Sequence, residues 1–346
     1  MMEIGEFAWA EVFLEEAVAG AEARGDASLA AEAALMRLLV RSNYAEGWSE
    51  DELVREAERA IPVFEQAGYH AGLAKASRLL AWAHGTAGRY GAAAATAQRA
   101  IDHAQLAGDR RQQARAATQY AVAALYGPTP VSEAISRCEQ FIVQADGDRR
   151  SEGLLVSLLS RLESMQGDLD RARELYVEAR ETLGELGRTV VAFSTSLDSC
   201  GVEMLAGDPA AAERELRRDY EALAEMGEKY LLSTVAAELC RALSAQGRYS
   251  DAEEFGRIAE ETAAEDDVTS QALWRSGRAK VLVRRGEHEP AVALAREAVE
   301  RMRRTDAWVI QGDALVDLAE VLDVADRPGE ARRALEEALD LFERKG

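Results

Sequence analysis

One turn-and-helix pattern recurs along this chain about every forty residues. A turn residue, which is glycine in five of seven cases, is followed five positions later by alanine in every case. The turn residues stand at intervals of 41, 38, 40, 40, 39 and 40 residues and are Gly88, Thr129, Gly167, Gly207, Gly247, Gly286 and Asp326. Repetition at such a period predicts a stack of similar units, each contacting its neighbours.

Small side chains and a second series of breaks define the unit. Seven residues before each turn residue stands alanine, valine, serine or cysteine. Antiparallel helices approach closely only where side chains are small, and larger groups there would cost about 1–3 kcal/mol each. Breaks such as Gly68 and Gly227 lie about 20 residues from the turn residues, and glycine ends helices through a left-handed backbone. The predicted unit is therefore helix, turn, helix, turn.

These observations predict an all-α fold, a right-handed α-solenoid of about eight helical hairpins within a single domain, residues 1–346. One extra N-terminal helix is expected over residues 3–24. The hairpins are expected over residues 26–67, 69–107, 109–146, 148–186, 188–226, 228–265, 267–305 and 307–345. Pro62 lies inside the second helix of the first hairpin and is expected to kink it.

The composition narrows the classes of partner. With 41 Lys and Arg against 62 Asp and Glu, the net charge is −21, which disfavours direct binding of nucleic acid because phosphates need a surplus of cations. Three cysteines without CxxC spacing predict neither a disulfide framework nor a zinc site, and favour a cytoplasmic location. No run of about 18 apolar residues occurs, so no membrane span is predicted.

Motifs of catalysis and metal binding are missing from the sequence. The four histidines His70, His84, His103 and His288 form no HExxH or HxH pattern, and there is no GxSxG or GxxxxGK[ST]. We therefore predict no metal site, no cofactor and no catalytic residue. An enzyme is the least favoured of the functional classes.

The glycine-to-alanine signature, with small residues seven positions before the turn, resembles the tetratricopeptide repeat. The usual repeat of that family has about 34 residues, whereas the period here is about 40. HEAT repeats have a similar length but lack the glycine-to-alanine signature. The resemblance covers nearly the whole chain and implies a binding surface along the first helices.

Four segments resemble a narrower group, the C-terminal helical region of large bacterial signalling proteins of the actinobacterial kind. The segments are Leu125–Ile135, Leu205–Arg218, Asp266–Lys280 and Gly312–Leu322. In that group a class III adenylate/guanylate cyclase domain and a P-loop ATPase domain precede the repeats. Neither activity is carried over, because the chain has no phosphate-binding loop motif. Whether the chain is a fragment, a stand-alone relative or the product of a mis-started gene stays open.

The resemblance also implies which residues line the groove. In tetratricopeptide repeats these positions lie about thirteen, ten, six and three residues before the turn glycine. Here they include Lys75, Arg78, Trp82, Gln119, Tyr126, Arg161, Ser194, Arg241 and Lys280. Cations prevail from Lys75 to Lys280, and acids appear only near the C-terminal end. This pattern predicts an acidic peptide, a carboxylate or a phosphorylated ligand; ordinary solvated helix positions with internal ion pairs are the alternative.

Arg275 and Arg278 occupy positions that carry apolar or small residues in most other repeats. A charged group on a packing face needs a partner, because an unpaired buried charge is costly. The expected partners are carboxylates of neighbouring first helices, namely Glu238, Asp313 or Asp317. The two arginines are expected to form an ion-pair lock between repeats, and a ligand-anchoring pair is the alternative.

The sequence thus predicts a non-catalytic scaffold or sensor module that binds a peptide or a partner domain in its concave groove. The resemblance places it in bacterial signal transduction or transcriptional regulation. The alternative is a regulatory small-molecule receptor, in which a ligand held between repeats alters their winding. Co-purification with a protein would favour the scaffold, and a melting-temperature shift with one metabolite would favour the receptor.

Overall fold

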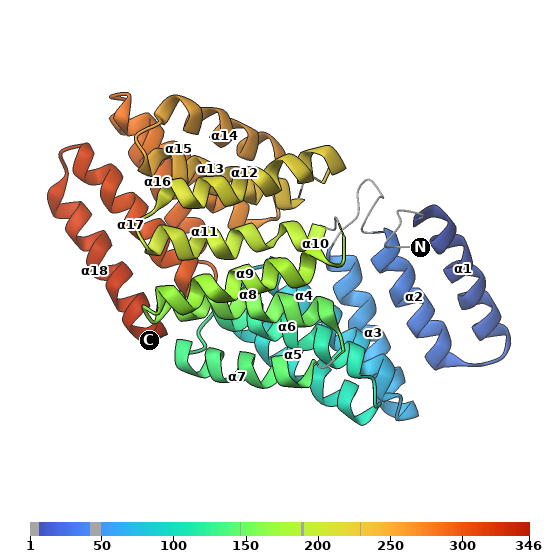
Figure 1. Cartoon of the computed structure of the whole chain (residues 1–346). Coiled ribbons are helices and arrows are strands. Elements are labelled where there is room, and N and C mark those ends of the chain that lie inside the picture. The colour runs from blue at the N-terminus through green and yellow to red at the C-terminus, as the bar shows by residue number, and fades with distance from the viewer. Residues whose placement is uncertain (1–6, 42–49, 146, 188–189, 229) are drawn as a thin grey trace. The chain divides into compact units, whose positions relative to one another are not determined.

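The computed structural model describes residues 7–41, 50–145, 147–187, 190–228 and 230–346. Over these residues the chain consists of α-helices and turns without a β-strand, so the predicted all-α fold is confirmed (Figure 1). The chain forms two compact units. Unit 1 consists of Met1–His84 and Ala92–Tyr120, and unit 2 of Gly85–Gly91 and Ala121–Gly346. The grouping of all hairpins into one domain stays a prediction.

Unit 1 holds the N-terminal helices. They are α1 (Phe7–Ala23), α2 (Ala27–Arg41), α3 (Glu50–Ala67) and most of α4 (His70–Thr86), α5 (Tyr90–Leu106) and α6 (Arg110–Tyr126). Its core includes Leu35, Leu53, Phe64 and Leu79. The helix α3 continues through Pro62. Residues 3–6 of the expected N-terminal helix and residues 42–49 of the first expected hairpin lie outside the described residues.

Unit 2 continues with paired helices to the end of the chain. They are α7 (Val131–Gln144), α8 (Arg149–Met165), α9 (Leu169–Gly184), α10 (Val190–Phe193), α11 (Thr195–Leu205), α12 (Pro209–Met226), α13 (Tyr230–Ala245), α14 (Tyr249–Thr262), α15 (Val268–Arg284), α16 (His288–Met302), α17 (Trp308–Val324) and α18 (Pro328–Lys345). Residues 188, 189 and 229, which begin or adjoin expected hairpins, lie outside the described residues.

The turn between α11 and α12 shows why the repeated pattern makes hairpins. Gly207 has φ 75°, and the next amide, of Asp208, donates back to the carbonyl oxygen of Glu203 at 2.9 Å, which closes the helix end. The carboxylate of Asp208 then accepts from the amide of Ala211 at 2.9 Å, and Pro209 occupies the first turn of α12. At the last turn Asp326 takes the place of glycine and has φ 59°.

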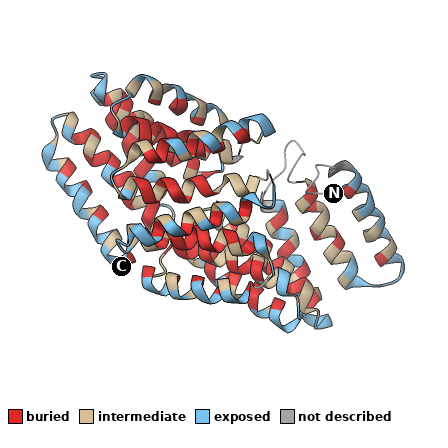
Figure 2. Ribbon diagram, viewed as in Figure 1, coloured by how far each residue is buried: buried red, intermediate tan, exposed pale blue. Residues whose placement is uncertain are grey.

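Many residues on the helices of unit 2 are buried (Figure 2). The alanines five positions after the turn residues are among them, as their role in close packing requires. In unit 2 they are Ala134, Ala172, Ala212, Ala252, Ala291 and Ala331. The first helices of successive hairpins also pack against one another, because α11 contacts α8 and α13, and α15 contacts α13 and α17. These first helices form a continuous layer, which carries the candidate site.

Two polar contacts join the start of unit 2 to its last helices. The carboxylate of Asp306 accepts hydrogen bonds from the amides of Tyr90 and Gly91, the latter at 2.8 Å. The ammonium group of Lys345, which is 1% exposed, donates to the carbonyl oxygens of Gly127 at 2.9 Å and Thr129 at 2.6 Å. Unit 2 is therefore closed by contacts between residues more than 200 positions apart.

Candidate functional site

A cavity of about 280 Å³ lies within unit 2. The end of α6 lines it together with the first helices α8, α11, α13, α15 and α17. Four residues predicted for the groove, Tyr126, Arg161, Arg241 and Lys280, belong to this lining. The cavity therefore brings together cations that are spread over 120 residues of sequence.

Carboxylates surround two of these cations. The guanidinium of Arg241 donates to both carboxylate oxygens of Glu238, at 3.1 and 3.0 Å, and its Nε lies 3.2 Å from Oδ2 of Asp317. The ammonium group of Lys280 lies 3.1 Å from Oδ1 of Asp317 and 2.7 Å from Oε2 of Glu320. Arg241 and Lys280 thus share Asp317, and their charges are compensated inside unit 2.

Asp313 and Asp317, both on α17, have opposite pKa shifts. Burial pushes the pKa of Asp317 upward, but the charges of Lys280 and Arg241 outweigh burial and hold that pKa below its ordinary value. Burial also raises the pKa of Asp313, and here Arg241 and Arg161 offset the effect only in part. Oδ2 of Asp313 is 4.0 Å from the nearest guanidinium nitrogen of Arg241, so this pairing is weak.

Arg161 differs from the other two cations of the cavity. Its Nη1 is buried and has no hydrogen-bond partner among the described residues, and its guanidinium forms no ion pair with a described carboxylate. The guanidinium lies against Gly201, where an added Cβ would be 2.2 Å from Cζ. Since arginine stays protonated in proteins, Arg161 contributes a positive charge without a direct partner.

A buried carboxylate lies near Arg161 but is bound to another group. Oδ2 of Asp198 accepts a hydrogen bond from the hydroxyl of Ser157 at 2.6 Å. Burial raises the pKa of Asp198 to about 6, although the Ser157 hydrogen bond and the charge of Arg161 both act to lower it. Asp198 is thus largely ionised at neutral pH and compensates Arg161 only through space.

Apolar side chains form the rest of the wall. Leu197 and Met204 come from α11, Leu273 from α15, and Val309 and Ile310 from α17. A cavity that combines an apolar wall with a few fixed charges suits a ligand that has both an apolar and an ionised part.

The remaining predicted groove residues lie elsewhere. Lys75 forms an ion pair with Glu32 inside unit 1, and Nε of Arg78 donates to Oε1 of Gln112 at 3.2 Å. Both cations therefore have partners within their own unit. The sequence pattern did not reveal these partners because they stand on neighbouring helices 43 and 34 residues away.

Three further predicted residues have structural surroundings. Trp82 packs against the hydrophobic core of unit 1, and Oε1 of Gln119 is buried without a hydrogen-bond partner in the described part of the chain. Ser194 precedes α11, and its hydroxyl donates to the carbonyl oxygen of Val191 at 2.8 Å. Their assignment to a binding groove stays a prediction.

Sequence reasoning missed the acids that surround the cations of the site. Asp198, Glu238 and Asp317 each stand nine residues before a turn residue, a position that was not assigned to the groove. Leu79 and Leu158 occupy the same position in other repeats. A recurring acid at an otherwise apolar position was the signal that could have identified them.

Arg275 and Arg278 have carboxylate partners, but not the expected ones. Nε of Arg275 lies 2.9 Å from Oε1 of Glu297 on α16, and Arg278 pairs with Glu253 at 3.5 Å and with Glu260, both on α14. The expectation that Glu238, Asp313 or Asp317 would pair with them is wrong. The two arginines project between second helices, which explains the difference.

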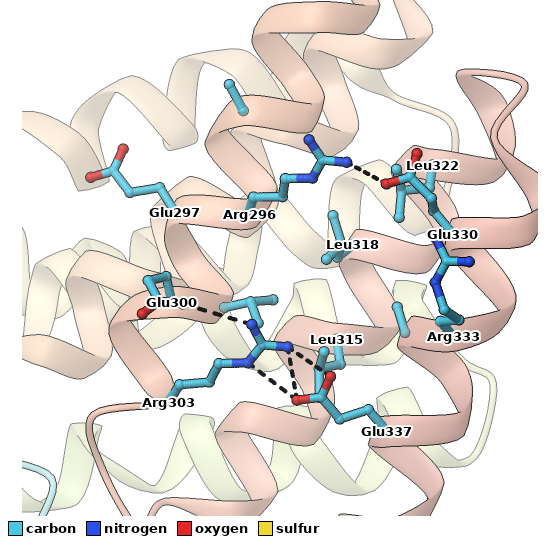
Figure 3. A pocket seen from close by; sticks show the side chains of 13 residues that line it. Arg296, Glu297, Glu300, Arg303, Leu315, Leu318, Leu322, Glu330, Arg333 and Glu337 are labelled. Atoms are coloured by element: carbon cyan, nitrogen blue, oxygen red, sulfur yellow. Dashed lines mark hydrogen bonds and ion pairs between the residues drawn. The ribbon is translucent and has the colours of Figure 1, made fainter.

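A larger groove of about 710 Å³ lies between α16 and α18 (Figure 3). Nη2 of Arg303 lies 2.7 Å from Oε2 of Glu337, and Arg296 pairs with Glu330, so both ion pairs join the two helices. Leucines of α17 form its floor. Because its main charges are paired across the groove, we interpret it as the seam between two hairpins.

Reactive thiols, metal-binding clusters of three or more side chains and membrane-spanning helices find no support in the described residues. Cys138, Cys200 and Cys240 are buried free thiols, and burial raises the pKa of Cys138 and of Cys240 to about 12. The described part of the chain contains no group of three or more histidine, cysteine, aspartate or glutamate side chains able to hold a metal ion. None of the described helices combines the length and apolarity needed to cross a membrane.

Comparisons with known proteins find a repeat family in the C-terminal part of the chain. The tetratricopeptide repeat family model matches residues 269–344. A Rap protein complexed with Competence and Sporulation Factor has a similar structure, with a TM-score of 0.70 and 11% sequence identity over 98% of this chain and 99% of that one. At that identity the likeness shows a shared fold. No curated protein matches the chain.

Two further solved structures are similar over part of the chain. BtubC (BKLC) from P. vanneervenii is 15% identical, with a TM-score of 0.44 over 62% of this chain and 88% of that one. A kinesin light chain repeat protein from Podosopora anserina is 18% identical, with a TM-score of 0.38 over 54% and 92%. The narrower resemblance to cyclase–ATPase signalling proteins stays a prediction.

Proposed function

We propose that unit 2 is a binding module whose cavity receives a peptide, or an extended segment of a partner protein, that carries a carboxylate. The observation that carries the proposal is Arg161, which lines the cavity without a hydrogen bond or ion pair among the described residues. A guanidinium nitrogen that is buried without a direct partner, as Nη1 of Arg161 is, is unfavourable. A ligand carboxylate would supply that partner through charge-assisted hydrogen bonds.

The other charges of the cavity support an anchoring role for Arg161 in particular. Arg241 and Lys280 already have carboxylate partners, so a second anion gains less from them. Asp313 is weakly paired and is available to accept a hydrogen bond from a ligand N–H group. The apolar side chains of α11 and α17 would cover a ligand's apolar side chain.

The fold also supports the proposal that the cavity binds a peptide. The similar Rap protein was crystallised in complex with Competence and Sporulation Factor, so a structure of this kind can hold a bound factor. We extend this to the present chain as a proposal, together with a cytoplasmic role in bacterial signal transduction or transcriptional control. The assignment of Lys75, Arg78, Trp82 and Gln119 of unit 1 to a binding surface is retained as a separate proposal.

A small carboxylate or phosphate metabolite is the second candidate. The cavity volume of about 280 Å³ lies close to the lower end of small-molecule pockets, roughly 300 Å³. Such a ligand would use the same Arg161 anchor but would need no extended partner.

Parallel selections from a random hexapeptide library distinguish these candidates. Wild type, Arg161→Gln and Arg150→Gln are used as targets; Arg150 is exposed on the same helix as Arg161 and serves as the matched control. The proposal expects acid-bearing sequences to be enriched on wild type and Arg150→Gln but not on Arg161→Gln. Equal enrichment on all three proteins would reject it. Failure to enrich any peptide, with a melting-temperature rise for one anionic metabolite, would favour the second candidate.

A further inference from the structure

Two histidines that are 33 residues apart in sequence meet in unit 1. His70 is the first residue of α4, and His103 lies in the last turn of α5. Their Nδ1 atoms are 3.2 Å apart. The ring centroids are 5.4 Å apart, and the ring planes differ by 25°. The two Nδ1 atoms are therefore within hydrogen-bond distance of each other, and the tautomers decide which of them donates.

The separation of the two nitrogens matches that of two ligands on one metal ion. Zinc–nitrogen bonds of about 2.0–2.1 Å at a tetrahedral angle place the nitrogens about 3.3–3.4 Å apart. The observed 3.2 Å differs little from this value. An ion could thus bind both Nδ1 atoms with only a slight movement of the rings.

The surroundings of His103 favour the neutral imidazole that metal binding requires. Burial lowers the pKa of His103, and the neighbouring His70 lowers it further. Asp102 and Glu65 act in the opposite direction, and Arg99 acts with burial. The charged neighbours of His103 are thus two carboxylates and one guanidinium, and their net negative charge also favours a bound cation.

We propose that His70 and His103 bind a transition-metal ion of the zinc and copper class through their Nδ1 atoms. Imidazole suits these ions, and each neutral ring keeps its proton on Nε2. Water completes the coordination, since the described residues offer no third ligand of the usual kinds. The ion joins the start of α4 to the end of α5. This site lies in unit 1 and is independent of the cavity of unit 2.

Calorimetric titration with ZnCl2 at pH 7.5 tests the proposal. Wild type and His288→Ala are expected to bind one ion per chain with a rise in melting temperature, and His70→Ala and His103→Ala are expected to lose both effects. His288 is the matched control because it lies in unit 2. MgCl2 in place of ZnCl2 reports binding to surface carboxylates, and should not discriminate among the four proteins.

A second readout guards against misfolded variants. With one equivalent of Cu²⁺, the electron paramagnetic resonance spectrum of wild type should show coupling to two imidazole nitrogens. Zinc binding that is equal in wild type and both histidine variants, or a copper spectrum without nitrogen coupling, would overturn the proposal. In that case the rings share an N–H···N hydrogen bond only.

Discussion

The guanidinium of Arg161 on α8 occupies the space beside Gly201 on α11 in which a side chain at position 201 would lie. The two residues stand at the same place in successive repeats, six positions before Gly167 and Gly207. Arg241 and Lys280 fill this place in two later repeats. The missing side chain of one repeat thus makes room for the arginine of the previous one.

Replacing Gly201 with alanine should displace the Arg161 guanidinium and so weaken binding of a selected peptide. The new Cβ would be 2.2 Å from Cζ of Arg161, which is the end of a flexible side chain facing the cavity, so the guanidinium can move aside and the free energy of unfolding should change by less than about 1 kcal/mol. A Cβ added at Gly184, in α9, would meet only open space, so Gly184→Ala should leave peptide binding as in wild type and stability unchanged or raised by up to about 1 kcal/mol. Urea unfolding and calorimetric titration with one selected acid-bearing hexapeptide measure the two effects. Equal peptide affinity of Gly201→Ala and Gly184→Ala would contradict the position of Arg161 beside Gly201.

Removal of Arg241 should have a larger effect than removal of Arg161. Arg241→Met leaves the buried Asp317 and the half-buried Glu238 with fewer partners, and breaking a buried pair in this way costs about 3–5 kcal/mol. The double variant with Asp317→Asn should recover part of the loss. Arg161→Gln should change the free energy of unfolding by less than about 1 kcal/mol, because no ion pair is broken. Equal losses for both single variants would contradict the different pairing of the two arginines.

Asp198 should make stability depend on pH. Burial raises its folded pKa to about 6, above the ordinary value of about 3.9 in an unfolded chain. Between these two pKa values the carboxyl of Asp198 is protonated in the folded state and ionised in the unfolded state. Above pH 6 the buried carboxylate is ionised and destabilises the folded state, and this destabilisation disappears as the pH falls to 4. Asp198→Asn removes the ionisable group and keeps an oxygen that accepts from the Ser157 hydroxyl. Because the destabilising charge is lost, the variant should gain up to about 3 kcal/mol of stability at pH 7.5 and almost none at pH 4. Chemical denaturation of both proteins at the two pH values is the measurement, and a less stable variant at pH 7.5 would refute this account.

The contact of Lys345 with the turn after α6 should stabilise unit 2. Lys345→Met leaves the carbonyl oxygens of Gly127 and Thr129 without this donor, which costs about 1–3 kcal/mol. Arg332→Met, on the exposed side of the same helix, should have an effect within about 0.5 kcal/mol. Thermal unfolding followed by circular dichroism compares the two variants. Matching melting temperatures would mean that the closing contact contributes nothing.

Much of the fold could be predicted from the sequence because glycine and alanine act locally. Gly207 ends one helix through its own backbone conformation, and Ala212 is buried because the next helix lies close. The site was only partly predictable. Repeat position predicted Arg161 and Arg241 as groove residues. The carboxylates near such cations could not be predicted, because they lie on helices that the repeat pattern does not pair. For the same reason His70 and His103 seemed unrelated.

The most direct test of the central claim is the affinity of one selected acid-bearing hexapeptide for three proteins, measured by isothermal titration calorimetry. A charge-assisted hydrogen bond is worth about 1.5–3 kcal/mol, so the Kd for Arg161→Gln should exceed that for wild type by about tenfold or more, with an unchanged melting temperature. Arg150→Gln should bind as tightly as wild type. Equal affinity of all three proteins for the peptide would contradict the assignment of Arg161 as the anchor of the cavity.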